Sequence, residues 1–172
     1  MPNNDNSPTN NFMGKPCHSV PGPRPAQVDP GAKMLRAAAV LLARYQIRNL
    51  RRLFEEFERD ILLPILLGEI ALHNIGALEN GANSAAFDDT ESLMANLRPC
   101  NAYSIAAATG LPRETVRRKI ARLAELGWIT RQENGHLFLT PQAIRHFGDL
   151  LGSRDLPELL ETADRIRRFI QD

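Results

Sequence analysis

The sequence predicts a mainly α-helical fold that carries one short β-hairpin. From residue 33 onward, most segments place apolar residues at helical spacing. Residues 127–141 differ, because two runs of β-favouring residues flank an Asn-Gly pair, a pattern typical of a hairpin. The 172 residues are 43% hydrophobic and 24% charged, which is ordinary for globular proteins and indicates a packed core.

Composition excludes several classes of protein. The chain has 21 basic and 20 acidic residues and a net charge of +1, so overall charge favours no partner. Cys17 and Cys100 cannot form a disulfide scaffold, and no CxxC pair of the zinc-binding type is present. The apolar runs 37–43 and 61–67 are shorter than the ~20 residues that a bilayer span needs, and the N-terminus lacks the apolar segment of a signal peptide. We therefore expect a cytoplasmic protein with no membrane association.

The chain divides at residue 33, where its composition changes. Residues 1–32 hold seven of the 12 prolines and few apolar side chains, which predicts a flexible tail. The same segment could instead lie over a partner subunit. Residues 33–98 form the next predicted unit and begin with a helix over 33–60, which contains no Gly or Pro. Residues 37–43 are apolar on every face of that helix, which indicates that a second chain covers it and that this unit dimerises.

The second half of this unit is predicted to contain two more helices. One runs from its cap at Asp60 to the stop signal Asn80-Gly81. Asp88 and Glu91 have the spacing of a capping box for a short helix that follows. Charge is segregated along the chain: seven basic and four acidic residues in 33–60 (+3), none and five in 61–97 (−5), and six and two in 101–131 (+4).

Residues 99–141 carry the most specific pattern. Asn101 is a good N-cap for a helix over 102–109, and Gly110 ends that helix where a left-handed residue is needed. Leu111-Pro112 then starts a second helix after a tight turn. The apolar stripe of this second helix consists of Val116, Ile120 and Leu123. At ~100° per residue, its opposite face holds Glu114, Arg117, Arg118, Ala121, Arg122 and Glu125.

A hairpin follows this helix pair. Strands are predicted over 128–132 and 137–139, joined by Asn134-Gly135 as a two-residue type I′ turn. Thr140-Pro141 then caps a further helix. Helix, tight turn, helix and hairpin in this order make a helix-turn-helix with a wing.

The segment SIAAATGLPRETVRRKIARLAELGWI, residues 104–129, resembles the winged-helix DNA-binding domain of bacterial transcriptional regulators. Within it, RETVRR is similar to the start of the recognition helix in the Crp/Fnr family. That resemblance implies that Arg113, Glu114 and Arg118 reach base edges in the major groove. The chain lacks the alternating strands of that family's cyclic-nucleotide-binding barrel. Its order of elements, with helices on both sides of the winged helix, resembles the MarR family instead.

Side-chain chemistry favours DNA contact independently of the resemblance. The Arg guanidinium fits guanine O6 and N7 or a phosphate, and Glu can accept from cytosine N4. The expected DNA-binding residues are Asn101, Ser104, Arg113, Glu114, Arg117, Arg118, Arg122 and Arg131. The alternatives are an ordinary solvated basic face for the helix, and capping or packing for Asn101 and Ser104. The wing offers only Arg131 and His136 as basic groups, so minor-groove reading and a purely structural hairpin both stay open.

Residues 142–172 are predicted to form two helices, over 142–151 and 157–170, separated at Gly152 and with Asp155 as the second cap. The apolar stripe of the last helix is Leu159, Leu160, Ala163, Ile166 and Ile170. Paired with the helix over 33–60, it would build an interlocked homodimer. The two-fold symmetry of such a dimer matches palindromic DNA sites.

The functional hypothesis is a homodimeric transcriptional regulator that binds double-stranded DNA. No enzyme, cofactor or metal site is expected, because HExxH, GxSxG, P-loop and GxGxxG motifs are absent and the pair Glu69 and His73 has no third ligand. The alternative is a protein-docking module that does not bind DNA. A third reading is a thiol sensor at Cys100, which precedes a helix N-terminus, where a thiol pKa falls. The existence of a small-molecule effector is left open.

Overall fold

The computed structural model describes residues 30–79 and 89–171, so the predicted tail lies outside it except for residues 30–32. Cys17 also lies outside it. The described elements are α1 (Pro30–Glu56), α2 (Leu62–Glu79), α3 (Thr90–Ala95), α4 (Ala102–Thr109), α5 (Arg113–Glu125), β1 (Ile129–Arg131), β2 (Leu137–Leu139), α6 (Pro141–Leu150), a π-helical turn (Leu151–Asp155) and α7 (Leu156–Gln171). The fold is mainly α-helical with a two-stranded antiparallel sheet, as predicted. Among the described helices, none is long and apolar enough to cross a membrane.

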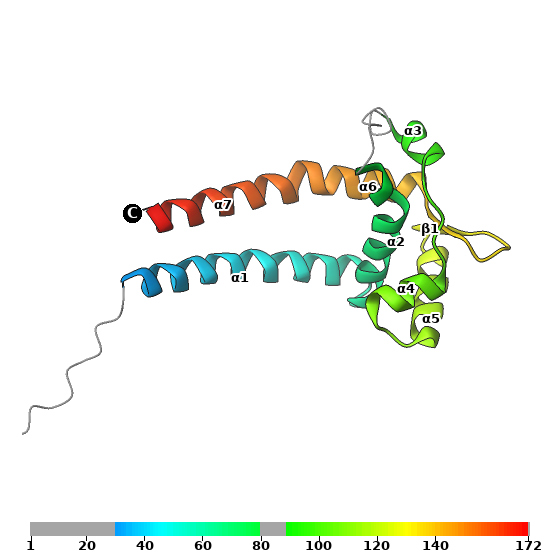
Figure 1. Cartoon of the computed structure of the whole chain (residues 1–172), viewed down its shortest axis with the longest axis horizontal. Helices are drawn as coiled ribbons and strands as arrows, with labels where there is room; N and C mark the ends of the chain where they lie inside the picture. The colour runs from blue at the N-terminus through cyan, green and yellow to red at the C-terminus, as the bar shows by residue number, and fades with distance from the viewer. Residues whose placement is uncertain (1–29, 80–88, 172) are drawn as a thin grey trace, which may run out of the picture.

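The molecule has an arm and a body (Figure 1). The arm consists of α1 and α7, which lie side by side and run in opposite directions. The body consists of α2, α4, α5 and the sheet, at one end of the arm. Because α6 continues through the π-helical turn into α7, one long helical segment connects the body to the arm.

Helix α1 begins at Pro30, three residues before the predicted start. Proline is favoured in the first turn of a helix, where its missing N–H costs no hydrogen bond. Ala38, Leu41 and Tyr45 recur at spacings of 3 and 4, which is typical of a helix paired with another helix. Of these, Ala38 is buried, and the Tyr45 hydroxyl lies 3.5 Å from the carbonyl oxygen of Asp155. This stripe therefore faces the other helix of the arm, α7, and the π-helical turn before it.

The turn between α1 and α2 ends the first helix earlier than predicted. Glu58 and Arg59 adopt left-handed φ values of 55° and 63°, so the chain cannot continue as an α-helix to residue 60. Phe57 is 1% exposed and anchors the turn in the core. Asp60 Oδ1 accepts a hydrogen bond of 3.2 Å from the first amide of α2, which confirms the predicted cap.

Helix α3 has a different cap from the predicted one. Its N-cap is Asp89, whose Oδ1 accepts from the backbone N of Ser92 at 2.7 Å. An N-cap side chain reaches an amide two or three residues ahead, so a helix that begins at Thr90 is capped by residue 89. The hydrogen bonds from Ser92 lower the pKa of Asp89. Asp88 and the predicted stop signal Asn80-Gly81 lie outside the described residues.

One apolar core joins the body to the base of the arm. Its most deeply buried side chains include Phe57, Leu63, Leu66, Ile70, Ile105, Val116, Ile120, Leu123 and Leu137. Three rings meet where the arm joins the body: the centroid of Phe147 lies 5.7 Å from that of Phe57 and 5.2 Å from that of Trp128. Aromatic pairs at these separations add ~0.5–1.5 kcal/mol beyond their burial. The body and the arm are therefore packed against each other through α1, α6 and the start of the sheet.

The hairpin has the predicted strands and a different turn. A type I′ turn needs positive φ at both central residues, whereas in this turn only Gly135 has one, at 82°. The amide of Gly135 donates to the carbonyl oxygen of Gln132 at 2.9 Å. The side chain of Asn134 accepts from the amide of His136 at 3.0 Å, which holds Asn134 out of the left-handed conformation. The result is a three-residue loop that ends in a left-handed glycine.

The predicted break at Gly152 does not occur. Thr140 caps α6 as predicted, since its Oγ1 accepts from the amide of Ala143 at 3.1 Å. The chain then continues helically through the π-helical turn, and Asp155 pairs with Arg154 (Nε–Oδ1 2.7 Å) instead of capping a new helix. Glycine ends a helix only where it turns left-handed, and Gly152 has no positive φ. Packing of α7 along α1 favours the continuous course.

Candidate nucleic-acid interface

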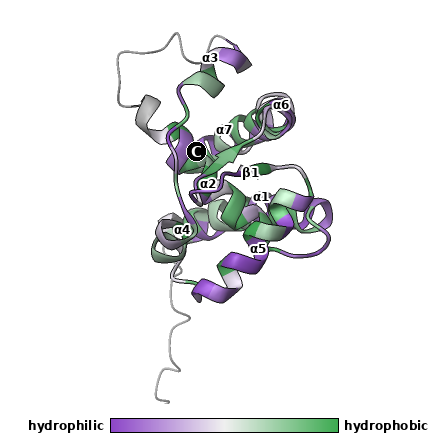
Figure 2. Ribbon diagram, turned by 90° about the vertical axis from the view of Figure 1, so that its right-hand side faces the viewer, coloured by the Kyte–Doolittle hydropathy of each residue, from purple (hydrophilic) through white to green (hydrophobic). Residues whose placement is uncertain are grey.

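The geometry of the α4–α5 pair is fixed at its ends. Asn101 caps α4 as predicted: its Oδ1 accepts from the Ser104 amide at 2.9 Å, and Ser104 Oγ accepts from the Asn101 amide at 3.2 Å. Gly110 ends α4 with a φ of 67°, and α5 follows directly after Leu111-Pro112. The buried residues of α5 are the predicted stripe, Val116, Ile120 and Leu123. The opposite face of α5 is therefore turned to solvent, and most of this helix is hydrophilic in Figure 2.

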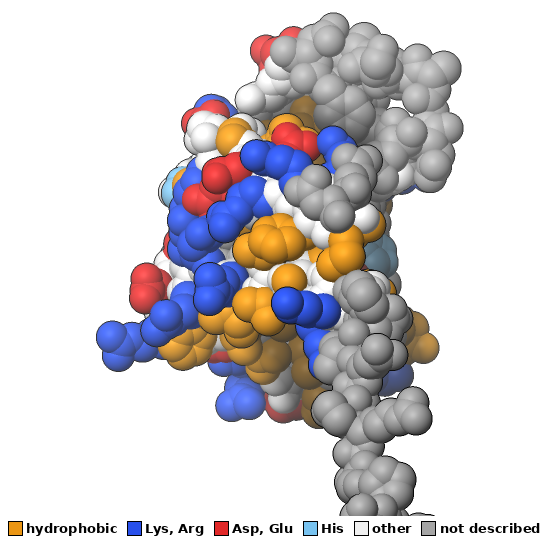
Figure 3. All heavy atoms as spheres, turned by 90° about the vertical axis from the view of Figure 1, so that its left-hand side faces the viewer, with side chains coloured by type: hydrophobic (Ala, Val, Ile, Leu, Met, Phe, Trp, Pro, Cys, Tyr) orange, Lys and Arg blue, Asp and Glu red, His pale blue; other side chains and the backbone are white. Residues whose placement is uncertain are grey.

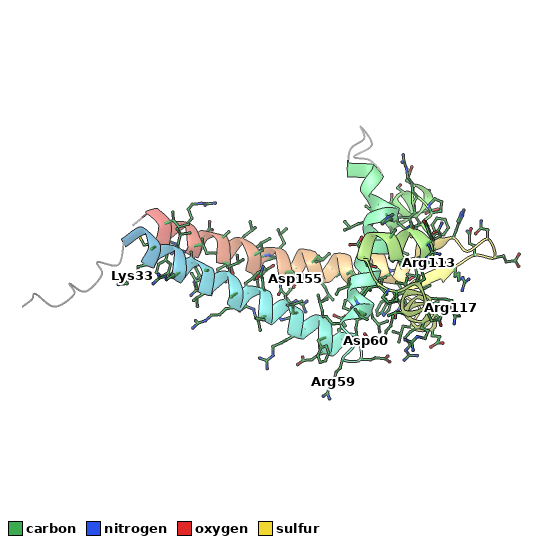
Figure 4. The ribbon with its side chains drawn as sticks, turned by 60° about the horizontal axis from the view of Figure 1, so that its bottom comes forward. Lys33, Arg59, Asp60, Arg113, Arg117 and Asp155 are labelled. Atoms are coloured by element: carbon green, nitrogen blue, oxygen red, sulfur yellow. The ribbon has the colours of Figure 1, made fainter. Side chains whose placement is uncertain are left out.

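Two arginines on this face have no ion-pair partner. The guanidinium carbon of Arg113 lies 4.6 Å from the centroid of the Tyr103 ring. This cation–π contact orients the guanidinium without neutralising it. Arg118 is exposed, and among the described residues its side chain has no hydrogen bond and no carboxylate within 4 Å, although its charge helps to lower the pKa of Glu114. Figure 4 labels Arg113 and Arg117 at the end of the molecule that lies away from the arm.

Glu114 and Arg117, both predicted to contact DNA, are paired with each other. Arg117 donates from Nε to Glu114 Oε2 at 2.9 Å and from Nη2 to Oε1 at 2.7 Å. These hydrogen bonds lower the pKa of Glu114 and raise the pKa of Arg117. Both side chains are largely exposed, at 65% and 62%. Exposed pairs of this kind are worth ~0–1 kcal/mol, so either group can exchange its partner for a DNA group.

Arg122, also predicted to contact DNA, is held by the turn between α1 and α2. Its Nε donates to Glu58 Oε2 at 3.0 Å, and its Nη1 donates to Glu125 Oε2 at 2.9 Å. Three residues earlier on α5, Lys119 pairs with Asp60 of the same turn between α1 and α2. The hydrogen bond from Arg122 lowers the pKa of Glu58. These two ion pairs fix the C-terminal half of α5 to the base of the arm, a role that the helical spacing did not reveal.

The hairpin and the start of α4 enclose a polar notch beside α5. Its volume is about 420 Å³, and its lining includes Asn101, Tyr103, Arg117, Arg131 and Asn134. Arg131 is exposed on β1 and brings a positive charge from the wing to the same notch as Arg117. The side chains of Asn101 and Ser104 form the capping box of α4, and Asn101 also lines the notch. Of the predicted DNA-binding residues, the notch thus brings together Asn101, Arg117 and Arg131, from the start of α4, from α5 and from β1.

Asn74 is a structural residue of this region that sequence analysis missed. Its side chain is fully buried in α2. Its Nδ2 donates to the carbonyl oxygens of Arg98 at 2.6 Å and Leu137 at 3.2 Å, and its Oδ1 accepts from the amide of Leu139 at 2.9 Å. Asn74 therefore ties α2 both to β2 and to the segment that precedes α4. The only signal of this role in the sequence is that Asn74 is a polar residue within a mainly apolar helix.

Cys100 does not have the environment of a reactive thiol. The side chain is 5% exposed, and burial raises its pKa to about 11. The expected lowering by the helix N-terminus is outweighed by desolvation, so the thiol sensor hypothesis gains no support. Glu69 and His73 meet only through a 2.9 Å contact between His73 Nδ1 and the backbone oxygen of Glu69. In the part of the chain that the structure describes, no group of three metal-ligating side chains occurs.

An apolar cavity lies where the arm joins the body. It has a volume of about 420 Å³ and lies between the end of α1, α2, α6 and the π-helical turn. Its apolar lining includes Leu53, Phe57, Leu67, Ile144 and Phe147, and Arg154 and Asp155 supply its charged groups. A cavity of this size and character is typical of small-molecule sites.

Comparison with known proteins adds no relative. No known family model, curated protein or solved structure matches the chain. The functional argument therefore stands on the residues and geometry described above.

Proposed function

We propose that this protein is a sequence-specific regulator that binds duplex DNA through a winged helix-turn-helix, with α5 in the major groove. The observation that carries the proposal is the two-sided character of α5. Its apolar stripe is sealed in the core while Arg113 and Arg118 extend to solvent from the first half of the helix, with no carboxylate of the described chain within 4 Å of either guanidinium. The N-terminal half of a recognition helix is the part that reads base edges.

The order of elements supports the same assignment. Cys100 forms an isolated antiparallel bridge with Leu137, which adds a short third segment to the sheet before α4. The body then follows the order helix, bridged residue, helix, helix, hairpin. In this arrangement α4 packs against α5 and the hairpin follows α5 directly, so that a DNA duplex would meet α5, the start of α4 and the wing together.

Electrostatics also favour this face for DNA. Arg117 and Arg131 line one notch, Arg113 lies over the ring of Tyr103 in the same notch, and the first turn of α5 contains a single acidic residue, Glu114. Arginines that neutralise phosphates release bound counterions, which gives affinity that falls steeply with salt. Bidentate contacts from arginine to guanine would supply sequence preference.

The homodimer belongs to this proposal, because the arm exposes an apolar face. Exposed apolar side chains of the arm include Leu35, Leu42, Leu50, Leu159, Leu160 and Ile170. A stable interface buries about 800 Å² per partner, and the exposed apolar residues of the two arm helices are the surface that could supply it. A second copy of the chain would cover this face and place two α5 helices for a palindromic site.

DNA selection from a random pool tests the proposal. The purified full chain should enrich a palindromic or repeated site, and its affinity for that site should exceed that for scrambled duplex. Affinity should fall linearly with the logarithm of salt concentration, because phosphate contacts release counterions. Absence of both enrichment and salt-dependent duplex binding would refute the proposal and favour the protein-docking module.

A further inference from the structure

A second candidate site lies in the arm, away from α5. Between α1 and α7 is a small polar notch of about 180 Å³. Its lining consists of Leu41, Arg44, Tyr45, Arg48, Thr162 and Arg165. The two helices thus bring three guanidinium groups and two hydroxyl groups to one small space. Every polar group of this lining can donate a hydrogen bond, and none of its side chains is acidic.

The charges around the notch are only partly balanced. Arg48 lies 3.1 Å (Nε–Oε2) from Glu158, and the same carboxylate also accepts two hydrogen bonds from Arg52, at 3.0 and 2.8 Å. One carboxylate therefore serves two arginines. Within the described residues, Arg44 and Arg165 have no carboxylate within 4 Å and no side-chain hydrogen bond. A positive charge from each helix is left facing the notch.

The sequence of α1 reinforces this imbalance. From residue 33 to residue 54 the chain has six basic residues and no acidic one: Lys33, Arg36, Arg44, Arg48, Arg51 and Arg52. Like charges held this close on a helix repel one another. An anion in the notch would relieve that repulsion, because it would contact Arg44 on α1 and Arg165 on α7 at once.

The notch borders the apolar surface of the arm. At ~100° per residue, Arg44 is about 40° around α1 from the exposed Val40, and Arg165 is about 40° around α7 from the exposed Phe169. Figure 3, which views the molecule from the free end of the arm, shows Lys and Arg side chains bordering the hydrophobic ones. The proposed site therefore lies beside the apolar surface of the arm.

We propose that this notch between α1 and α7 binds a phosphate-type oxyanion, held by Arg44 and Arg165 and by the hydroxyl of Thr162. Guanidinium forks and hydroxyl donors match the oxygens of phosphate. The volume is several times what one water molecule requires, so a tetrahedral anion fits without displacing a helix. The bound anion would cross-link the two helices of the arm and stabilise their packing.

The anion has two chemical sources, a free phosphate monoester and the phosphodiester backbone of a nucleic acid. Inorganic phosphate and dimethyl phosphate represent the two sources in one experiment. The full-length protein is titrated with each by isothermal calorimetry, at constant ionic strength set with sodium chloride. Thermal unfolding with the same anions provides a second readout, because a ligand that binds only the folded state raises its stability.

Three single variants make the test specific to the notch. Arg44→Gln and Arg165→Gln remove its two unbalanced charges, and both side chains are exposed, so the fold should be kept. Arg36→Gln removes an equal charge from the same arm outside the notch. We expect saturable binding of at least one anion in the native chain and in Arg36→Gln, with affinity reduced at least tenfold in each notch variant.

The outcome also identifies the source of the anion. Binding of inorganic phosphate alone assigns the site to a free phosphate group, and binding of dimethyl phosphate assigns it to a nucleic-acid backbone. Equal thermal responses in all four proteins would show a general salt effect and overturn the proposal. Absence of saturable binding in the native chain would overturn it as well. Neither result depends on whether α5 reads DNA.

Discussion

Replacement of Asn74 by leucine should be among the most destabilising single changes in the body. Asn74→Leu keeps a side chain of similar size in the core but removes three hydrogen bonds, to the carbonyls of Arg98 and Leu137 and from the amide of Leu139. Leu137 and Leu139 are 1% and 5% exposed, so their backbone groups have little access to water. Each buried backbone group left without a partner costs ~1–3 kcal/mol. Because the structure around residue 74 can relax, the total cost is smaller than the sum of these separate costs. We expect the free energy of unfolding to fall by ~3–5 kcal/mol.

Urea denaturation at equal protomer concentration measures this loss. Asn96→Leu is the matched control, because Asn96 is exposed and its side chain makes a single hydrogen bond, from Nδ2 to the carbonyl oxygen of Ser92 at 2.8 Å. The control should lose no more than ~1 kcal/mol, since water can replace that bond. If Asn74→Leu unfolds at the same urea concentration as the control, then the buried network does not hold α2 against the sheet and the reasoning fails.

Four further results are expected. Arg118→Ala should lose ~1–3 kcal/mol of affinity for the selected DNA site and relax preference at one base position; an equal loss on all sequences would make Arg118 a phosphate contact instead. If the proposed dimer forms through the apolar face of the arm, Leu42→Glu should give monomers in light scattering, because it places a charge on that face; a dimer mass that persists in the variant would exclude that face as the interface. Cys100 should resist alkylation at pH 8 in the folded protein and react on unfolding, because burial raises its pKa to about 11; rapid labelling of the native chain would contradict the buried assignment. Arg122 lowers the pKa of Glu58, so the native protein should be more stable than Glu58→Gln at pH values above the pKa of Glu58 in the unfolded chain. This difference in stability should disappear as the pH falls through the lower pKa of Glu58 in the folded protein. A difference that persists in acid would refute an ionic origin.

Local sequence chemistry predicted most of the body, because the decisive signals act over a few residues. The cap at Asn101, the left-handed Gly110 and the stripe through Val116 and Ile120 each depend on neighbours within one or two helical turns. The hairpin turn was one local feature that the sequence did not predict correctly. Asn134 can either adopt a left-handed backbone or accept a hydrogen bond with its side chain from a nearby amide. In this turn the Asn134 side chain accepts from the amide of His136, so its backbone is not left-handed.

Features that join distant parts of the chain were not predictable from periodicity. The π-helical turn at residues 151–155 arises where α6 packs on the body and α7 packs on α1, so its cause lies in two contacts far apart in sequence. Asn74 reaches Leu139, 65 positions later in the chain. A polar residue on an apolar helix signals a buried network, but only the fold identifies its partners.

The charged face of α5 shows why helical periodicity overpredicts free arginines. Periodicity fixes where a side chain leaves the helix, whereas its head group is placed by whichever opposite charge lies within reach. Arg122 is reached from Glu58, 64 positions earlier, and so becomes part of the joint between arm and body. Arg117 finds Glu114 one turn away, and because that pair is exposed it costs at most ~1 kcal/mol to open when DNA arrives. Arg113 and Arg118 have no ion-pair partner in the described structure, so they would displace no ion pair on contact with DNA. We therefore expect the preference for a DNA sequence to depend on these two residues more than on the other arginines of α5.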